Sequence, residues 1–110
     1  MIEVREYLDR RNRSPFGTWF NQLDKTVAAK VAVVLTRIGL GNFSNVKSVG
    51  RGVFEYKLDF GPGFRIYFGK DGQAVVILLG GGSKKRQPKD IQDASVRWND
   101  YQERKLQGEQ

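Results

Sequence analysis

Five side chains in the second half of the chain have types and spacings that suit the cleavage of RNA. Alternation along segments 53–60 and 64–68 places Glu55 and Lys57 on one side of an expected strand, and Arg65 and Tyr67 on one side of the next. A further cation, Lys84, follows the third apolar segment. Cleavage of RNA by its own 2′-hydroxyl needs a base for that hydroxyl, cations for the phosphate and an acid for the leaving oxygen. Glu, Lys, Tyr and Arg side chains can fill those roles.

A cationic segment adds to this set. Residues 80–89 contain three consecutive glycines, four cations and no acid, so the backbone could approach a phosphate closely. The segment is not a Walker A loop, because the G-x-x-x-x-G-K-[ST] spacing fails and the next helix is expected to begin too late. We interpret its polar side chains as RNA-binding: Lys85, Arg86, Gln87 and Lys89.

Both features also have plainer interpretations. Charged alternating strands usually form a solvated face, on which each cross-strand ion pair contributes only about 0.2–1 kcal/mol. A short cationic run is often a flexible loop without a function. Tyr67 could stack on an RNA base or simply be a typical strand residue. On the pattern alone the solvated face is favoured, but segment 74–79 is apolar on both faces, which predicts that the charged face is partly covered and weakens that interpretation.

Composition narrows the classes of function. The chain has 110 residues, with 19 Lys and Arg against 12 Asp and Glu, and the net charge of +7 favours nucleic acid as a partner. With no Cys and no His, it has no disulfide, thiolate zinc site or thiol nucleophile, and it lacks the commonest acid–base group. We expect no metal and no cofactor. Neither a signal peptide nor a membrane-spanning stretch is apparent, so a cytoplasmic location without membrane contact is expected.

The first part of the chain is expected to form one strand and two helices. Residues 2–8 suit a short strand. Ser14 followed by Pro15 is typical of a helix start, and Asp24 can cap a second helix that ends at Gly39 and Gly41. These two helices should form a hairpin. Their apolar residues recur every three or four positions: Phe16, Trp19, Phe20 and Leu23, then Val27, Val31, Val34, Leu35 and Ile38.

The rest of the chain is expected to form a three-stranded meander and a last helix. Segments 53–60, 64–68 and 74–79 are typical of strands, joined by turns at 61–63 and 70–72. A three-residue loop would pair Phe60 with Phe64 and place Lys57 opposite Tyr67. The last helix has Pro88 and Asp90 near its start and leads into a polar tail after about residue 105. We therefore predict one α+β domain over residues 1–110.

Four motifs in compatible order resemble a known toxin family. The match runs from about Trp19 to Ala94 and resembles the phage-derived addiction module killer branch of the RelE/ParE toxin superfamily, which is related to HigB toxins. The motifs are Trp19-Phe20-x-x-Leu23-Asp24, Val46-Lys47-x-Val49-Gly50-x-Gly52-Val53-x-Glu55, Gly61-Pro62-Gly63-Phe64-Arg65-Ile66-Tyr67-Phe68 and Leu78-Leu79-x-Gly81-Gly82-Ser83-Lys84-x-x-Gln87.

The resemblance implies a fold and an activity. The implied RelE-like fold is a helical hairpin packed on a curved antiparallel sheet of about four strands, with a C-terminal helix. The implied activity is that of a type II toxin, a metal-independent endoribonuclease that cleaves messenger RNA on the ribosome and arrests translation and growth. The implied partners are messenger RNA, the ribosome and a cognate helix-turn-helix antitoxin.

Site roles carried over from the resemblance are also hypotheses. Arg65 and Lys84 would hold the scissile phosphate, Lys57 or Glu55 would act as the base, and Tyr67 would position or stack an RNA base. Glu55 could instead be a structural partner of Arg65. The ParE branch of the superfamily acts on DNA gyrase, so a gyrase-inhibiting toxin is an alternative, as is a non-catalytic module that binds RNA or a protein partner.

The loop departs from the family pattern. Members of the family often carry an acidic residue where Ser83 stands, and small polar residues where Lys85 and Arg86 stand. The loop is therefore more cationic than the pattern requires, which should strengthen contacts with the RNA backbone.

Overall fold

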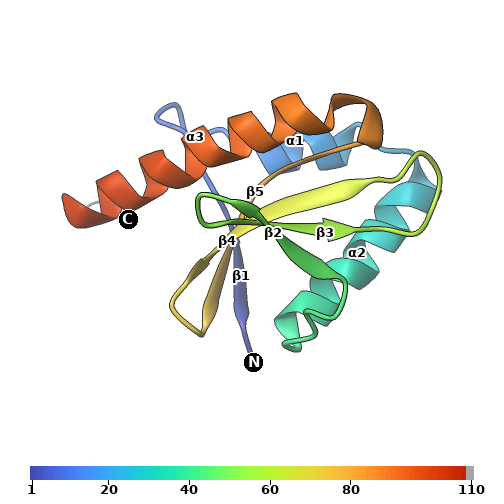
Figure 1. Cartoon of the computed structure of the whole chain (residues 1–110), viewed down its shortest axis with the longest axis horizontal. Helices are drawn as coiled ribbons and strands as arrows, with labels where there is room; N and C mark the ends of the chain where they lie inside the picture. The colour runs from blue at the N-terminus through green and yellow to red at the C-terminus, as the bar shows by residue number, and fades with distance from the viewer. Residues whose placement is uncertain (109–110) are drawn as a thin grey trace.

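Helices cover both faces of one five-stranded sheet in the computed structural model, which describes residues 1–108 (Figure 1). The strand order is β1-β5-β4-β3-β2. In chain order the elements are β1 (Glu3–Glu6), α1 (Pro15–Asn21), α2 (Lys25–Gly39), β2 (Val46–Gly50), β3 (Val53–Lys57), β4 (Arg65–Asp71), β5 (Val75–Gly82), a 3₁₀ turn η1 (Lys84–Arg86) and α3 (Gln87–Leu106).

The α+β class and the C-terminal helix are confirmed, but the sheet differs from the one expected. It has five strands instead of about four, and it is mixed, because β1 runs parallel to β5. The additional strand, β2, lies at the edge of the sheet, where Val46 and Val49 are only partly buried, so its sequence carries little alternation. The direction of β1 depends on its pairing with residues about 70 positions later, which local sequence does not report.

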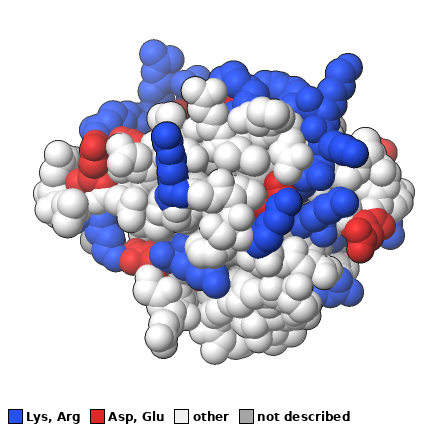
Figure 2. All heavy atoms as spheres, viewed as in Figure 1, with Lys and Arg blue, Asp and Glu red and all other residues white. Residues whose placement is uncertain are grey.

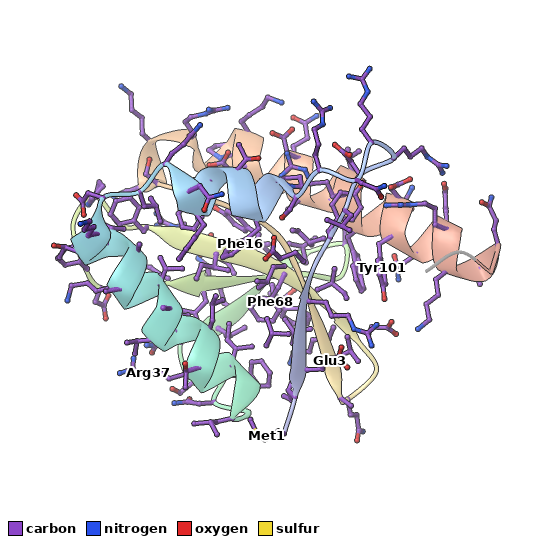
Figure 3. All side chains as sticks on the ribbon, turned by 180° about the vertical axis from the view of Figure 1, so that it is seen from behind. Met1, Glu3, Phe16, Arg37, Phe68 and Tyr101 are labelled. Atoms are coloured by element: carbon purple, nitrogen blue, oxygen red, sulfur yellow. The ribbon has the colours of Figure 1, made fainter. Side chains whose placement is uncertain are left out.

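The two N-terminal helices begin where their capping residues predict. The Ser14 hydroxyl accepts a hydrogen bond from the Gly17 amide (2.9 Å), and the Asp24 carboxylate accepts one from the Val27 amide (3.0 Å). Figure 3 shows α1 and α2 on one face of the sheet, with Phe16 of α1 and Phe68 of β4 in the layer between them. The expected stripe on α2 is buried there: Val27, Val31, Val34 and Ile38, with Leu35 partly buried.

Helix α3 covers part of the opposite face. Tyr67, Ile77, Leu79, Ala94 and Trp98 form a second buried cluster between the sheet and this helix. The expectation that the charged face is partly covered is therefore confirmed. None of the helices within residues 1–108 is long and apolar enough to cross a membrane.

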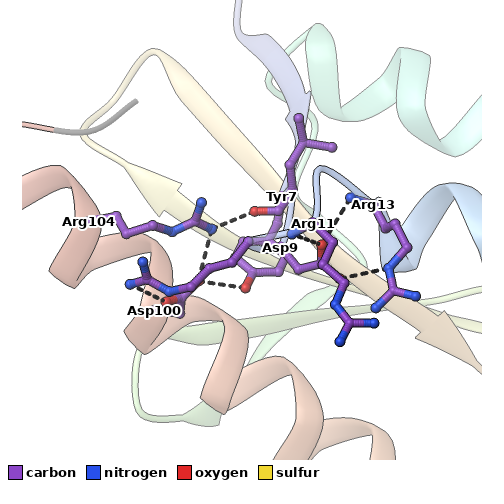
Figure 4. A network of polar contacts seen from close by, with 8 residues as sticks. Tyr7, Asp9, Arg11, Arg13, Asp100 and Arg104 are labelled. Carbon is purple, nitrogen blue, oxygen red and sulfur yellow. Dashed lines mark hydrogen bonds and ion pairs between the residues drawn. The ribbon is translucent and has the colours of Figure 1, made fainter.

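The C-terminal half of α3 is tied to the segment that follows β1 (Figure 4). The buried Tyr7 hydroxyl donates a 2.7 Å hydrogen bond to Asp100, which also pairs with Arg104 at 2.8 Å. Arg104 in turn donates to the Leu8 carbonyl. These contacts join the two ends of the chain across the sheet.

The expected register between β3 and β4 is wrong by two residues. Lys57 lies opposite Arg65, and Glu55 lies opposite Tyr67. The strands end earlier than predicted because residues 58–64 form a longer loop. In this loop the rings of Phe60 and Phe64 stack, with 6.5 Å between the ring centroids. A shift of two residues preserves the alternation of faces, so the four predicted side chains still share one side of the sheet.

The plainer interpretation of residues 80–89 as a flexible loop is wrong, because most of this segment lies in regular elements. Residues 80–82 continue β5, and η1 leads directly into α3 at Gln87. The glycines are required there because side chains from other elements lie against them: a Cβ on Gly81 would overlap the Trp19 ring, and one on Gly82 would overlap the Asp90 carboxylate. The glycines therefore permit close packing in a strand.

Candidate nucleic-acid interface

Strand pairing arranges the four predicted strand residues, together with Lys47, in two adjoining rows on the α3 face of the sheet. One row runs Lys47, Glu55, Tyr67 across β2, β3 and β4, and the next runs Lys57, Arg65 across β3 and β4. In Figure 2, Lys and Arg side chains gather on this face, over the part where β3 ends and α3 begins. The arrangement brings a group of cations to one corner of the molecule.

Arg65 is the best-fixed cation of the group. Its side chain is only 6% exposed, and its Nη1 donates a 2.6 Å hydrogen bond to the Gly63 carbonyl. Its Nε lies 3.4 Å from the Glu55 carboxylate. The guanidinium is therefore held in position by protein groups before any ligand arrives, which lowers the entropic cost of binding an anion there.

Glu55 is a structural partner of Arg65, as one of the two interpretations proposed. Its side chain is 1% exposed, and its Oε1 accepts a 2.7 Å hydrogen bond from the Gln87 side-chain amide. Its Oε2 lies 3.7 Å from the Lys47 ammonium. A buried carboxylate surrounded by these partners is poorly placed to take a proton from an RNA hydroxyl. Because the Gln87 side-chain amide donates to Glu55, the predicted contact of Gln87 with RNA is not favoured.

Tyr67 cannot stack on an RNA base in this structure. It has no exposed surface, because α3 covers it. Burial raises the pKa of the Tyr67 hydroxyl, and the nearby Glu55 and Asp90 carboxylates raise it further. Its hydroxyl oxygen has no hydrogen-bond partner among residues 1–108. The stacking role is therefore corrected to a core role, which the sequence did not reveal because β4 alternation predicts only the face.

The exposed members of the predicted set lie around Arg65. Lys57 is exposed directly opposite Arg65 on β3. A methyl group built on Gly63 would lie 3.2 Å from Arg65 Nη1 and 3.7 Å from Lys84 Cβ, so the Lys84 side chain starts beside the guanidinium. Lys85, Arg86 and Lys89 are also exposed, although Lys89 pairs with Asp93 at 2.7 Å. The structure thus brings Lys57, Arg65 and Lys84 together.

Lys47 also belongs to the site, although the sequence did not indicate it. Its side chain is 68% exposed, and its ammonium reaches Glu55 from β2, the strand that the sequence did not predict. The Val46-Lys47 pair within the family-like motif was the available signal. Residues 1–108 contain no group of three or more His, Cys, Asp or Glu side chains that could hold a metal ion.

The chain is similar in sequence to a bacterial protein. An uncharacterized protein of Haemophilus influenzae is 40% identical over 82 residues, which cover 74% of this chain and 83% of the relative. The chain belongs to the same family as that protein. No family model matches the chain. The name of the relative states no activity, so the function has to be inferred from the geometry of the site.

Proposed function

We propose that the chain is the ribonucleolytic toxin of a type II toxin–antitoxin pair in the RelE/ParE superfamily. The observation that carries this proposal is the guanidinium of Arg65, which Glu55 and Gly63 hold beside the exposed Lys57 and the stem of Lys84. The four sequence motifs that resemble this superfamily, which include Glu55, Arg65 and Lys84, also support it.

The proposed chemistry uses these cations on one phosphodiester. Arg65 and Lys84 bind the non-bridging oxygens of the scissile phosphate and stabilise the added negative charge of the transition state. Lys57, in its neutral amine form, takes the proton of the 2′-hydroxyl, whose oxygen attacks phosphorus. The bond from phosphorus to the 5′-oxygen breaks and the 5′-oxygen takes a proton from solvent water, which produces a 2′,3′-cyclic phosphate on one fragment and a 5′-hydroxyl on the other. Glu55 acts by positioning Arg65.

The proposed partners follow from the charge of the site and from the resemblance. Messenger RNA on the ribosome supplies the phosphodiester, and the net charge of +7 favours such an anionic surface. A cognate helix-turn-helix antitoxin would mask the cationic corner with an acidic or amphipathic segment.

A second candidate is a non-catalytic RNA-binding module. The specific observation that favours it is the burial of both Glu55 and Tyr67, which leaves only lysines and arginines exposed at the corner. Such a set binds RNA backbones without needing to cleave them.

Regulated expression in a bacterial host separates the candidates. Lys84→Ala removes an exposed phosphate-binding cation, whereas Lys25→Ala removes an exposed cation at the start of α2 and serves as the matched control. The original chain and Lys25→Ala should arrest growth and produce cut messages in primer extension, and Lys84→Ala should lose both by about tenfold or more.

Two other outcomes would overturn the proposal. Arrest with intact messages and altered DNA supercoiling would indicate a gyrase-inhibiting toxin. Normal growth with intact messages, together with RNA binding by the purified chain, would indicate a non-catalytic module.

A further inference from the structure

Gly80 and Gly81, the first two of the three consecutive glycines of β5, line an open pocket of about 370 Å³ between α1 and the first turns of α3. Each glycine lies beneath one side chain that lines this pocket. A Cβ on Gly80 would lie 2.8 Å from Arg97, and Cβ atoms on Gly81 and Gly82 would overlap Trp19 and Asp90. The glycines thus allow an aromatic ring, a guanidinium and a carboxylate to lie close to one strand.

Two polar side chains in the pocket, those of Asp90 and Arg86, have no hydrogen-bond or ion-pair partner among residues 1–108. The Asp90 carboxylate receives no hydrogen bond from residues 1–108, although one of its oxygens is fully buried. Asp93, one helical turn later, also lines the pocket and shares one oxygen with Lys89. Arg86 is exposed and forms no ion pair within the described chain. Arg97 uses one nitrogen to donate to the Leu79 carbonyl at 2.9 Å.

The Asp90 carboxyl group is buried enough for its pKa to be shifted. Burial raises the pKa of its carboxyl group, and Asp93 raises it further, while Arg86 and Arg97 oppose the shift. Groups whose pKa is shifted by burial and neighbouring charges cluster at functional sites, and the Asp90 carboxyl group also lines an open pocket.

We propose that this pocket binds a guanine base. The Watson–Crick edge of guanine presents two N–H donors, on N1 and on the 2-amino group, which suit the carboxylates of Asp90 and Asp93. Its O6 and N7 are acceptors that suit a guanidinium such as that of Arg97. The half-buried indole of Trp19 offers a surface on which the base can stack. Adenine presents an acceptor at N1, which would face a carboxylate without a hydrogen bond.

The pocket adjoins the cationic corner through η1. Arg86 lines the pocket, and Lys84 begins the same turn beside Arg65. An RNA strand on the cationic corner could therefore place a guanine in the pocket while Arg86 contacts a phosphate. This extension from nucleotide to RNA rests on the proposed function, whereas binding of a free nucleotide does not.

Isothermal titration calorimetry of the full chain with guanosine and adenosine 5′-monophosphates tests the proposal. We expect the guanine nucleotide to bind at least tenfold more tightly than the adenine nucleotide. Asp90→Asn should reduce this preference about tenfold, while Glu103→Gln, which removes an exposed carboxylate elsewhere on α3, should preserve it. Circular dichroism melts establish that both variants fold.

A second variant separates recognition of the base from recognition of the phosphate. Arg86→Ala should reduce the affinity for both nucleotides by a similar factor and keep the preference for guanine. Equal affinities for the two nucleotides, or a guanine preference that survives Asp90→Asn, would overturn the proposal that this pocket binds guanine. Loss of guanine binding alongside intact Lys84-dependent cutting would refute the pocket alone, whereas guanine binding without any cutting would refute the proposed function alone.

Discussion

The side-chain amide of Gln87, at the first position of α3, donates a 2.7 Å hydrogen bond to the buried carboxylate of Glu55 on β3. This bond links the start of α3 to the group that holds Arg65. The position of the helix and the orientation of the guanidinium are therefore coupled, and changes at Glu55 should affect both stability and the proposed activity.

Glu55→Gln should be strongly destabilising. The change removes a buried charge that lies close to Arg65 and Lys47, and it leaves the nearly buried guanidinium without a counter-ion. Breaking such a pair costs about 3–5 kcal/mol when no other contact compensates, and the remaining bond from Arg65 to Gly63 should keep the loss nearer 2–4 kcal/mol. Urea unfolding measures the change. A loss below about 0.5 kcal/mol would show that the pair contributes nothing.

Two glycine substitutions should have opposite effects on stability. Gly81→Ala drives a methyl group into the Trp19 ring and should cost about 1–3 kcal/mol. Gly39→Ala, at the end of α2, meets only the Ile2 carbonyl at 3.7 Å and should stabilise the chain by about 0.5–1 kcal/mol. Thermal melts of the two variants compare them directly. An equal effect of both would contradict the tight packing of β5 against α1.

RNA binding by the cationic corner should depend steeply on salt. Each phosphate contact contributes a slope of about −0.7 in a plot of log affinity against log salt for a single strand. Lys84→Ala should therefore reduce the magnitude of the slope by about 0.7, with a similar loss for every RNA sequence. Fluorescence anisotropy with labelled single-stranded RNA provides the measurement. An unchanged slope would place Lys84 outside the RNA-binding surface.

Stability should fall in alkaline solution through Tyr7. Burial, together with its hydrogen bond to Asp100, raises the pKa of the Tyr7 hydroxyl to about 12, above its ordinary value of about 10. The protonated hydroxyl is favoured in the folded chain, so its contribution is complete below pH 10 and is lost as the pH rises toward 12.

Tyr7→Phe tests this pH dependence. The variant should be about 1 kcal/mol less stable at neutral pH and should lose less stability between pH 10 and 12. Tyr101, whose pKa burial and Asp71 also raise to about 12, keeps part of the alkaline loss in the variant. Urea unfolding across this pH range measures the stability of the two chains. Identical dependence of stability on pH would exclude Tyr7 as a source of the alkaline loss.

Local sequence patterns predicted the features that depend only on residues close in sequence, such as helix starts and strand faces. Ser14 and Asp24 cap helices as expected, because a cap needs only the next three residues. Alternation placed Glu55 and Arg65 on one face even though the register was wrong by two residues. The helix over Tyr67, the edge strand that carries Lys47 and the pocket above Gly81 depend on contacts between distant segments, and no local pattern reports them.

The chemistry of the cut ends tests the proposed activity most directly. After induced expression of the original chain and of Arg65→Lys, which keeps the charge but loses the forked guanidinium, the ends of abundant messages can be mapped. Attack by the 2′-hydroxyl predicts fragments with a 2′,3′-cyclic phosphate and a 5′-hydroxyl in cells with the original chain, and at least tenfold fewer of them with Arg65→Lys. Fragments with 5′-phosphates, or messages that stay intact while growth stops, would contradict the account.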